Sequence, residues 1–260
     1  MAVLRPPAAA GRLYPAEPAV LAGTIDTLLA EQAQLGQAPK ALVAPHGSYD
    51  CSGRIAAAAF GQLRAAHAWV RRVVVLGPCH YLPCSGVVLS SVTAFTTPLG
   101  EVEVDLEAQA RVADLPQVSR REDAHRDEHS IEVQLPFLQR LLGRFKLVPL
   151  IVGEAAADEV AEVLAALDHD GGSLIIVSSD LSHYHSYAAA RALDFAARAH
   201  IESLSNLRCQ DACGRAAING LLAYARERGL HARTLALSSS GDGAGDKSQV
   251  VGYGAFAFQA

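Results

Sequence analysis

Short runs of apolar, often β-branched residues recur along this chain, and turn-forming residues bound each of them. The runs are nearly continuous instead of alternating with polar residues, which is typical of strands that are covered on both faces. Strands of this kind belong to α/β proteins, in which helices pack on both sides of a sheet. We expect strands at 41–45, 72–77, 86–90, 146–152 and 174–178, and a last strand at 250–258.

Amphipathic or alanine-rich stretches lie between the apolar runs and predict helices. The expected helices are 18–31, 54–65, 155–167, 187–204 and 212–227. Pro136 interrupts a further helical stretch. Because a proline inside a helix costs about 3 kcal/mol, that helix should begin near Leu135, after an irregular segment at 128–134. The alternation predicts one α/β domain spanning residues 1–260, with a largely parallel central sheet flanked by helices.

The composition excludes several classes of protein. The formal net charge is -5 and no basic block is present, so nothing supports binding to nucleic acid. No stretch approaches the roughly 18 apolar residues of a membrane span, and the first residues lack the apolar core of a signal peptide. We therefore expect a cytoplasmic protein without a membrane partner. The five cysteines do not suggest a disulfide framework, and we interpret the pairs Cys79/Cys84 and Cys209/Cys213 mainly as reduced thiols.

Three of the predicted strands are followed closely by a histidine. His46 follows the first strand, His80 the second, and His183 the strand at 174–178. Ligands of open α/β sheets bind beyond the carboxyl ends of the strands, so three imidazoles there could converge on one metal ion. The alternative is that each histidine only bonds a loop carbonyl, and His185 is expected at the surface or behind the site.

Two polar segments could complete such a site. The segment 123–132 combines acids and imidazoles, including His129, and is either a solvated helix entry or a pocket wall that orients ligands or shuttles protons. The glycine-rich segment 238–248 resembles a phosphate-binding loop but has Asp246 before Lys247 and a strand after it, so nucleotide binding is not expected. Its Asp242 is a candidate carboxylate ligand, although a plain glycine-rich loop is the alternative.

Two imidazoles and a carboxylate form the facial triad that is typical of non-haem iron(II), but catalytic zinc sites use the same ligands. Ligand types alone therefore leave the metal open. A serine triad is a weak alternative, because Ser182 and His183 are adjacent but no nucleophile-elbow motif is present.

These segments resemble the Memo family, whose bacterial members are called AmmeMemoRadiSam system protein B. The resemblance covers nearly the whole chain, and several ordered motifs carry it. The motifs are Arg5–Ala8, Gly11–Pro15, Ala44–His46, Ser52–Gly53, Leu76–His80, Thr97–Gly100, Ala124–His125, Glu128–Phe137, Ser178–Tyr184, Ala212–Gly214, Ser240–Asp242 and Gly252–Tyr253.

The resemblance implies a fold similar to that of the class III extradiol dioxygenases, which open catechol rings with iron(II). It implies His46, His80 and Asp242 as metal ligands, with a cysteine in the animal protein at the third position. His183 matches the catalytic histidine, and His129 would lie in the pocket wall and share that acid/base role. The animal protein is discussed as a copper-binding redox protein and a phosphopeptide-binding factor, and the bacterial members are named for association with a radical-SAM protein.

The chain departs from the family pattern near both metal histidines. It has Gly47 and Ser48 where the family usually has alanine and glycine, Cys51 for a tyrosine, and Cys79 for a serine. Two thiols near the pocket could bias it toward soft metals or oxidation.

The sequence thus favours a metal-dependent redox enzyme, an oxygenase-like protein that acts on a small molecule. Iron(II) is the expected divalent metal, with copper and zinc as alternatives. The alternative function is a non-catalytic protein that binds a peptide or a metal in the same pocket. A metal-dependent hydrolase is the third choice.

Overall fold

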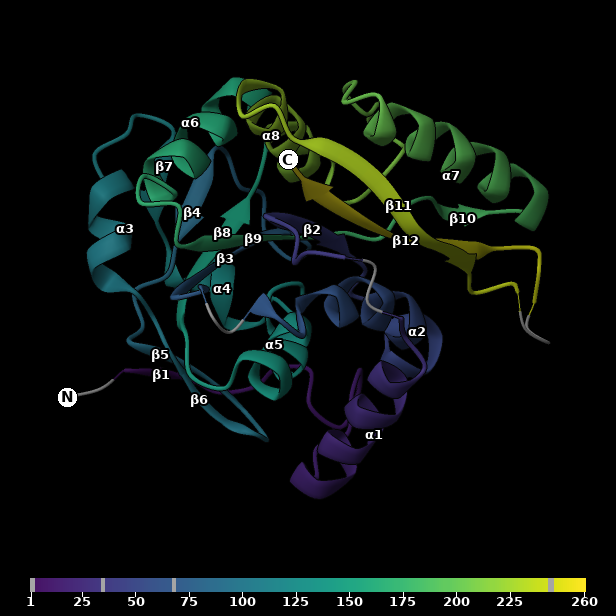
Figure 1. Cartoon of the computed structure of the whole chain (residues 1–260), viewed down its shortest axis with the longest axis horizontal. Helices are drawn as coiled ribbons and strands as arrows, with labels where there is room; N and C mark the ends of the chain where they lie inside the picture. Colours follow the sequence, from purple (N-terminus) through teal and green to yellow (C-terminus); the bar gives the residue numbers. More distant parts are fainter. Residues whose placement is uncertain (1–2, 34–35, 67–68, 243–245) are drawn as a thin grey trace.

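A mixed sheet forms the centre of the molecule in the computed structural model (Figure 1). The structure describes residues 3–33, 36–66, 69–242 and 246–260, and element statements below refer to these. The four central strands run parallel, whereas their outer neighbours pair antiparallel. In sheet order the strands are β10 (His183–His185), β12 (Val250–Gln259), β2 (Ala41–Ala44), β9 (Ser173–Ser178), β3 (Arg72–Pro78), β8 (Lys146–Val152), β4 (Val87–Leu89) and β7 (Val118–Arg120), and β11 (His231–Ser239) also pairs with β12.

Helices cover both faces of this sheet, as the continuous apolar strands predict. Successive residues of one strand belong to different cores. In β3, Val73 and Val75 pack with one group of helices, and Val74 and Leu76 pack with the other. One face is covered by α1 (Pro18–Ala30), α2 (Tyr49–Phe60) and α5 (Leu135–Leu142), and the other by α3 (Leu106–Val112), α6 (Ala157–Leu167), α7 (Tyr187–Glu202) and α8 (Arg215–Glu227) (Figure 1).

The helix expected near Leu135 begins at that residue, with Pro136 in its first turn, where a missing N–H does no harm. The irregular segment before it ends in a short 3-10 turn at Glu132–Gln134. Helix α2 begins at Tyr49, five residues before the expected start at 54. Gly53 lies inside that first part of α2, and glycine is a poor helix former, but there it packs against Leu28 of α1.

Several elements were not expected from the sequence. β11 is the largest, and it forms a long antiparallel pair with β12, so the sheet is parallel only in its centre and at the β4–β7 pair. A second, three-stranded sheet joins the N-terminal segment to a hairpin. The further unexpected elements are β1 (Leu4–Arg5), β5 (Ala94–Thr97), β6 (Gly100–Glu103), the helix α4 (Glu122–Arg126), and the elements α3, β7 and β10 given above. The end of the helix expected at 54–65 is a 3-10 turn, Gly61–Leu63.

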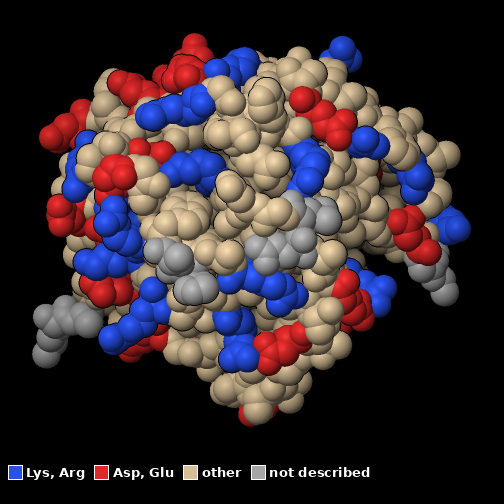
Figure 2. Space-filling view, in the orientation of Figure 1, with Lys and Arg blue, Asp and Glu red and all other residues tan. Residues whose placement is uncertain are grey.

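The surface carries charges of both signs. In Figure 2, Lys and Arg side chains are interspersed with Asp and Glu over the visible face and do not form one continuous basic area. This agrees with the net charge of -5. Among the described helices, none has both the length and the apolar character needed to cross a bilayer.

The sheet order determines where the histidines lie. β9 lies between β2 and β3, and the three strands are parallel. Their carboxyl ends, at Ala44, Ser178 and Pro78, therefore meet at one edge of the sheet. His46 and His80 each follow by two residues and so lie at the same edge.

Candidate metal centre

Three imidazole rings meet at the carboxyl edge of the parallel strands. The ring centroids of His46 and His80 are 5.1 Å apart, and that of His129 lies 5.4 Å from His46 and 4.9 Å from His80. His129 comes from the polar segment before α5, far from the other two in sequence. The structure thus brings together one histidine from each of three chain segments.

The tautomer of His46 follows from its hydrogen bonds. Its Nδ1 atom lies 3.0 Å from the Oγ atom of Ser178. That hydroxyl donates its own proton to the Ser130 carbonyl at 2.5 Å, so it accepts from the imidazole. The proton of neutral His46 is therefore on Nδ1, and the lone pair of Nε2 faces the Cys213 thiol at 3.4 Å. Burial lowers the pKa of His46 to about 4, although Asp180 opposes this shift, so the ring is neutral at pH 7.

Glu128 orients His80 through both carboxylate oxygens. Oε1 lies 2.9 Å from Nδ1 of His80, and Oε2 accepts the backbone N–H of the same residue at 2.7 Å. Burial alone would raise the pKa of Glu128, but the hydrogen bonds from His80 and from the Ser130 amide hold it at about 2. The ionised carboxylate therefore accepts the Nδ1 proton, and Nε2 of His80 is free. Carboxylate-to-histidine pairs of this kind are typical of metal-binding histidines.

His129 stacks on His80, with 20° between the ring planes. Its Nδ1 atom is buried and has no hydrogen-bond partner, although it lies 3.3 Å from Oε1 of Glu128. The two observations agree, because the distance is short but the angle is unsuitable for a bond. Burial lowers the pKa of His129, so this ring is a neutral acceptor beside the other two.

Cys213 reaches the same place from the segment before α8. Its Sγ atom lies 3.4 Å from Nε2 of His46, and one ligand atom from each of His46, His80 and Cys213 lies within 4.8 Å of the others. Two ligands of one tetrahedral zinc ion, at about 2.3 Å for sulfur and 2.0 Å for nitrogen, would be roughly 3.5 Å apart. Burial raises the pKa of the Cys213 thiol to about 12, so it is protonated until a cation displaces the proton.

Asp180 links Cys213 to His46. Its Oδ1 atom accepts the backbone N–H of His46 at 2.9 Å, and its carbonyl accepts the N–H of Cys213 at 3.3 Å. Oδ2 lies 4.0 Å from Nε2 of His46. Neither residue was predicted as a site residue from the sequence, where Asp180 lies only within the family motif Ser178–Tyr184 and Cys213 was interpreted as a reduced thiol. The signal for Cys213 was its place in the motif Ala212–Gly214 of the family pattern.

The structure places the other expected site residues elsewhere. The carboxylate of Asp242 accepts hydrogen bonds from Tyr187 at 2.6 Å and from the hydroxyl of Ser238 and the amide of Ser239, both at 2.9 Å. It belongs to neither group of candidate ligands found among the described residues. The residues 243–245 that follow it lie outside the described part of the chain.

His183 lies on β10, which pairs with β12 on the far side of β2 from β9. Its Nδ1 atom bonds the carbonyl of Leu181 at 2.8 Å. This is the alternative given above, in which a histidine after a strand bonds a loop carbonyl. Like Asp242, it is in neither candidate ligand group of the residues that the structure describes. The chain leaves β9 at Ser178 and has turned toward the edge of the sheet before His183.

Other residues of the polar segment 123–132 make buried hydrogen bonds that stabilise the fold. Nε2 of His125 bonds the carbonyl of Val88 at 2.9 Å. The buried carboxylate of Glu132 accepts bonds from Arg5 at 2.6 Å, from Tyr14 at 2.5 Å, and from backbone amides of the N-terminal segment. Arg5 in turn donates to the carbonyl of Glu128 at 2.5 Å. The N-terminal motifs therefore support the backbone that carries Glu128 and His129.

The donor atoms at this edge suit a transition metal. Two neutral imidazoles with unprotonated Nε2 atoms and a thiol are ligands for iron, copper or zinc, whereas magnesium and calcium prefer oxygen. The Nδ1 atom of His129 is buried and has no hydrogen-bond partner. A buried polar atom of this kind is available to bind a further ligand or a substrate.

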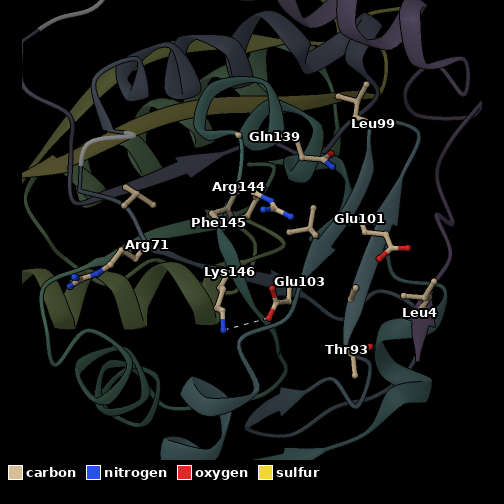
Figure 3. A pocket seen from close by; sticks show the side chains of 14 residues that line it. Leu4, Arg71, Thr93, Leu99, Glu101, Glu103, Gln139, Arg144, Phe145 and Lys146 are labelled. Carbon is tan, nitrogen blue, oxygen red and sulfur yellow. Dashed lines mark ion pairs between the residues drawn. The ribbon is translucent and has the colours of Figure 1, made fainter. Parts of the chain in front are cut away.

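A cavity of about 900 Å³ lies at the other end of the sheet, where β3 and β8 begin. Lys146 and Glu103 form an ion pair of 3.5 Å there, drawn as a dashed line in Figure 3, and Arg144 and Glu101 also line the cavity. The charged side chains of that ion pair are exposed, and none of the histidines described above lines the cavity. We place the functional site at the histidines, because metal-ligating side chains converge there and the pKa values of His46, His129 and Cys213 are shifted by burial.

Comparisons with known proteins identify the family to which the chain belongs. The family model for Memo-like protein matches residues 5–257. A MEMO1 family protein of Archaeoglobus fulgidus is 36% identical over 98% of this chain and 100% of its own length, and one of Methanosarcina mazei is 36% identical over 97% and 98%. The crystal structure of an uncharacterised protein from Escherichia coli K12 has the same fold, with a TM-score of 0.52 at 14% identity over 85% of this chain and 99% of its own. The match over nearly the whole length shows that the chain belongs to the Memo family.

Proposed function

We propose that this protein is a metal-dependent redox enzyme that binds iron or copper through His46 and His80 and acts on a small molecule. The observation that supports the proposal most is the pair of imidazoles with their Nδ1 protons held by Ser178 and Glu128. Two rings fixed in this way present both Nε2 atoms without further rearrangement, and a bound redox metal would supply the electron transfer.

The geometry favours Cys213 as the third ligand. Its sulfur already lies 3.4 Å from Nε2 of His46, whereas Asp242 would first have to give up its bonds to Tyr187 and Ser238. Asp242 is the alternative that the family resemblance implies. The choice affects the metal, because a thiolate favours copper or zinc and a carboxylate completes the facial triad of iron(II).

His129 is positioned to move a proton beside the metal ligands. Its ring is neutral because burial lowers its pKa, and it lies against His80 without being held by a hydrogen bond at Nδ1. A group of this kind accepts a proton from a substrate and returns it later. His183, which the family resemblance implies for this role, would need to approach from β10.

A non-catalytic metal-binding protein is the second candidate. It is favoured by the burial of His46, only 3% of whose surface is exposed, since a buried ligand limits access for a substrate. A zinc-dependent hydrolase uses the same ligands and is the third candidate.

Metal analysis of the anaerobically purified protein tests the proposal. We expect close to one iron or copper per chain in the wild type, and little in His46→Ala and His80→Ala. His231→Ala is the matched control, because that histidine lies exposed at the start of β11 and should leave the metal content unchanged. A wild type that binds no metal after reconstitution with iron and copper, or a His46→Ala variant that keeps full occupancy, would overturn it. Stoichiometric zinc without a response to oxygen or catechols would favour the hydrolase or the binding protein.

A further inference from the structure

Two thiols lie against each other in the loop between β3 and β4. The Sγ atoms of Cys79 and Cys84 are 2.8 Å apart, and both cysteines are free. The sulfur atoms of a disulfide are about 2.05 Å apart, so a bond requires an approach of only about 0.8 Å.

The backbone holds both cysteines in this relationship. Cys79 follows directly after Pro78, the last residue of β3, and its thiol donates to the carbonyl of Leu82 at 2.8 Å. The carbonyl of Cys84 accepts the amide of Glu154 at 3.0 Å. Gly153 permits this contact, because a Cβ atom there would overlap the Cys84 carbonyl. One end of the loop thus continues directly from β3, and the other is bonded to the segment that follows β8.

We propose that Cys79 and Cys84 form a reversible oxidation site, which hydrogen peroxide converts into an intrachain disulfide. In the first step the Cys79 sulfur attacks the peroxide, the O–O bond breaks, and Cys79 sulfenic acid and one water form. In the second step the Cys84 sulfur attacks the sulfenic sulfur and displaces a second water. Two thiols are oxidised by two electrons, the peroxide is reduced, and a dithiol reverses the bond by exchange.

The disulfide would close a short loop of the chain that contains His80. The residues between the two cysteines are His80, Tyr81, Leu82 and Pro83. Closure removes the bond from the Cys79 thiol to Leu82, so the state of the pair acts on the loop that carries His80. The oxidation itself needs no metal at His80, and its test is therefore independent of the proposed function.

Mass spectrometry of tryptic fragments tests the site. The full chain is treated with a small excess of hydrogen peroxide in the presence of EDTA, free thiols are alkylated, and the protein is digested. Fragment 73–111 contains both cysteines and no internal cleavage site. After peroxide treatment, we expect the mass of this fragment to be lower by two hydrogens, with no alkyl group attached. When dithiothreitol is added before alkylation, the fragment should instead carry two alkyl groups. Fragment 41–54, with the exposed Cys51, should remain alkylated.

Variants separate a specific pair from general oxidation. Cys79→Ser and Cys84→Ser each keep the size of the side chain and should abolish the product that lacks two hydrogens. Gly153→Ala displaces the Cys84 carbonyl and should slow its formation, provided that circular dichroism shows a folded chain. The proposal is overturned if fragment 73–111 of the oxidised wild type still takes two alkyl groups, or if it gains oxygen atoms instead of losing hydrogens.

Discussion

Glu128 accepts two hydrogen bonds from His80, one from the ring Nδ1 atom at 2.9 Å and one from the backbone N–H at 2.7 Å. Both bonds use one carboxylate that is almost fully buried. The carbonyl of Glu128 is in turn held by Arg5, which connects the N-terminal segment to the candidate metal centre. The orientation of His80 therefore depends on a residue that does not itself need to touch a metal.

Replacing this carboxylate should weaken metal binding without removing a ligand. Glu128→Gln keeps the size of the side chain but loses the charge and one acceptor oxygen, so the His80 ring is held less firmly. We expect metal affinity to fall by about 10–100-fold. Competition with a chromophoric chelator measures the change. Glu107→Gln, at an exposed position on α3, is the control and should bind like the wild type. An affinity of Glu128→Gln within twofold of the wild type would argue against the orienting role.

Buried histidines should make the metal-free protein less stable in mild acid. Burial lowers the pKa of both His46 and His125 from 6.5 to about 4. Between these values the unfolded chain binds more protons than the folded one, so stability is full above pH 6.5 and is lost as the pH falls toward 4. Each shift corresponds to roughly 3 kcal/mol at most. Glu128 adds little in this window, because its pKa is about 2 and the ordinary value is near 4.5.

Urea denaturation at a series of pH values from 7 to 4 measures this slope. His46→Asn removes one of the buried histidines whose pKa is lowered and should reduce the loss of stability over the window. His231→Asn, at the exposed start of β11, should leave the slope as it is. Equal slopes for the wild type and His46→Asn would contradict the assignment of His46 as a neutral buried ring.

Gly77 permits the close approach of the segment that carries Glu128. A Cβ atom at Gly77 would overlap the side chain of Ser130, whose amide bonds Glu128. Gly77→Ala should therefore destabilise the fold by about 1–3 kcal/mol and also weaken metal binding. Gly23→Ala is the matched control, since a Cβ atom there meets nothing within 4 Å and alanine favours the α1 helix. Thermal unfolding and chelator competition on both variants give the two readouts.

The positions of His46 and His80 could be predicted because they depend on a local pattern. Each follows a continuous apolar run, and the carboxyl ends of neighbouring parallel strands meet at one edge whatever the rest of the chain does. The start of α5 at Leu135 was predictable for a similar reason, since the effect of Pro136 is local.

Cys213 and His183 depend on contacts between distant segments, and the sequence around them does not show these. Cys213 reaches the site because its amide bonds Asp180, and because Gly214 fits against Ser179 where a Cβ atom would be too close. His183 follows its strand by five residues, enough for the chain to turn and pair with β12. β11 was missed because this edge strand has half-exposed residues instead of a clear apolar run.

The third metal ligand can be identified from variants of Cys213, Asp242 and His183. If the thiol is the ligand, Cys213→Ser should lower metal affinity more than the roughly 100-fold expected of residues behind the ligands. It should also remove the sulfur-to-metal charge-transfer band of the cobalt(II)-substituted protein. Asp242→Asn should retain both the affinity and the band. Cys51→Ser, at an exposed position, is the control for loss of a thiol.

His183→Ala should keep its metal in either case, because this ring belongs to neither group of candidate ligands among the described residues. If His183 moves a proton in the reaction, turnover should fall by about 10²–10⁴-fold with metal content unchanged. Loss of metal in Asp242→Asn, with full retention in Cys213→Ser, would instead establish the His46, His80 and Asp242 set and favour iron(II). That outcome would mean that Asp242 leaves Tyr187 and Ser238 when the metal binds, since both now occupy its carboxylate.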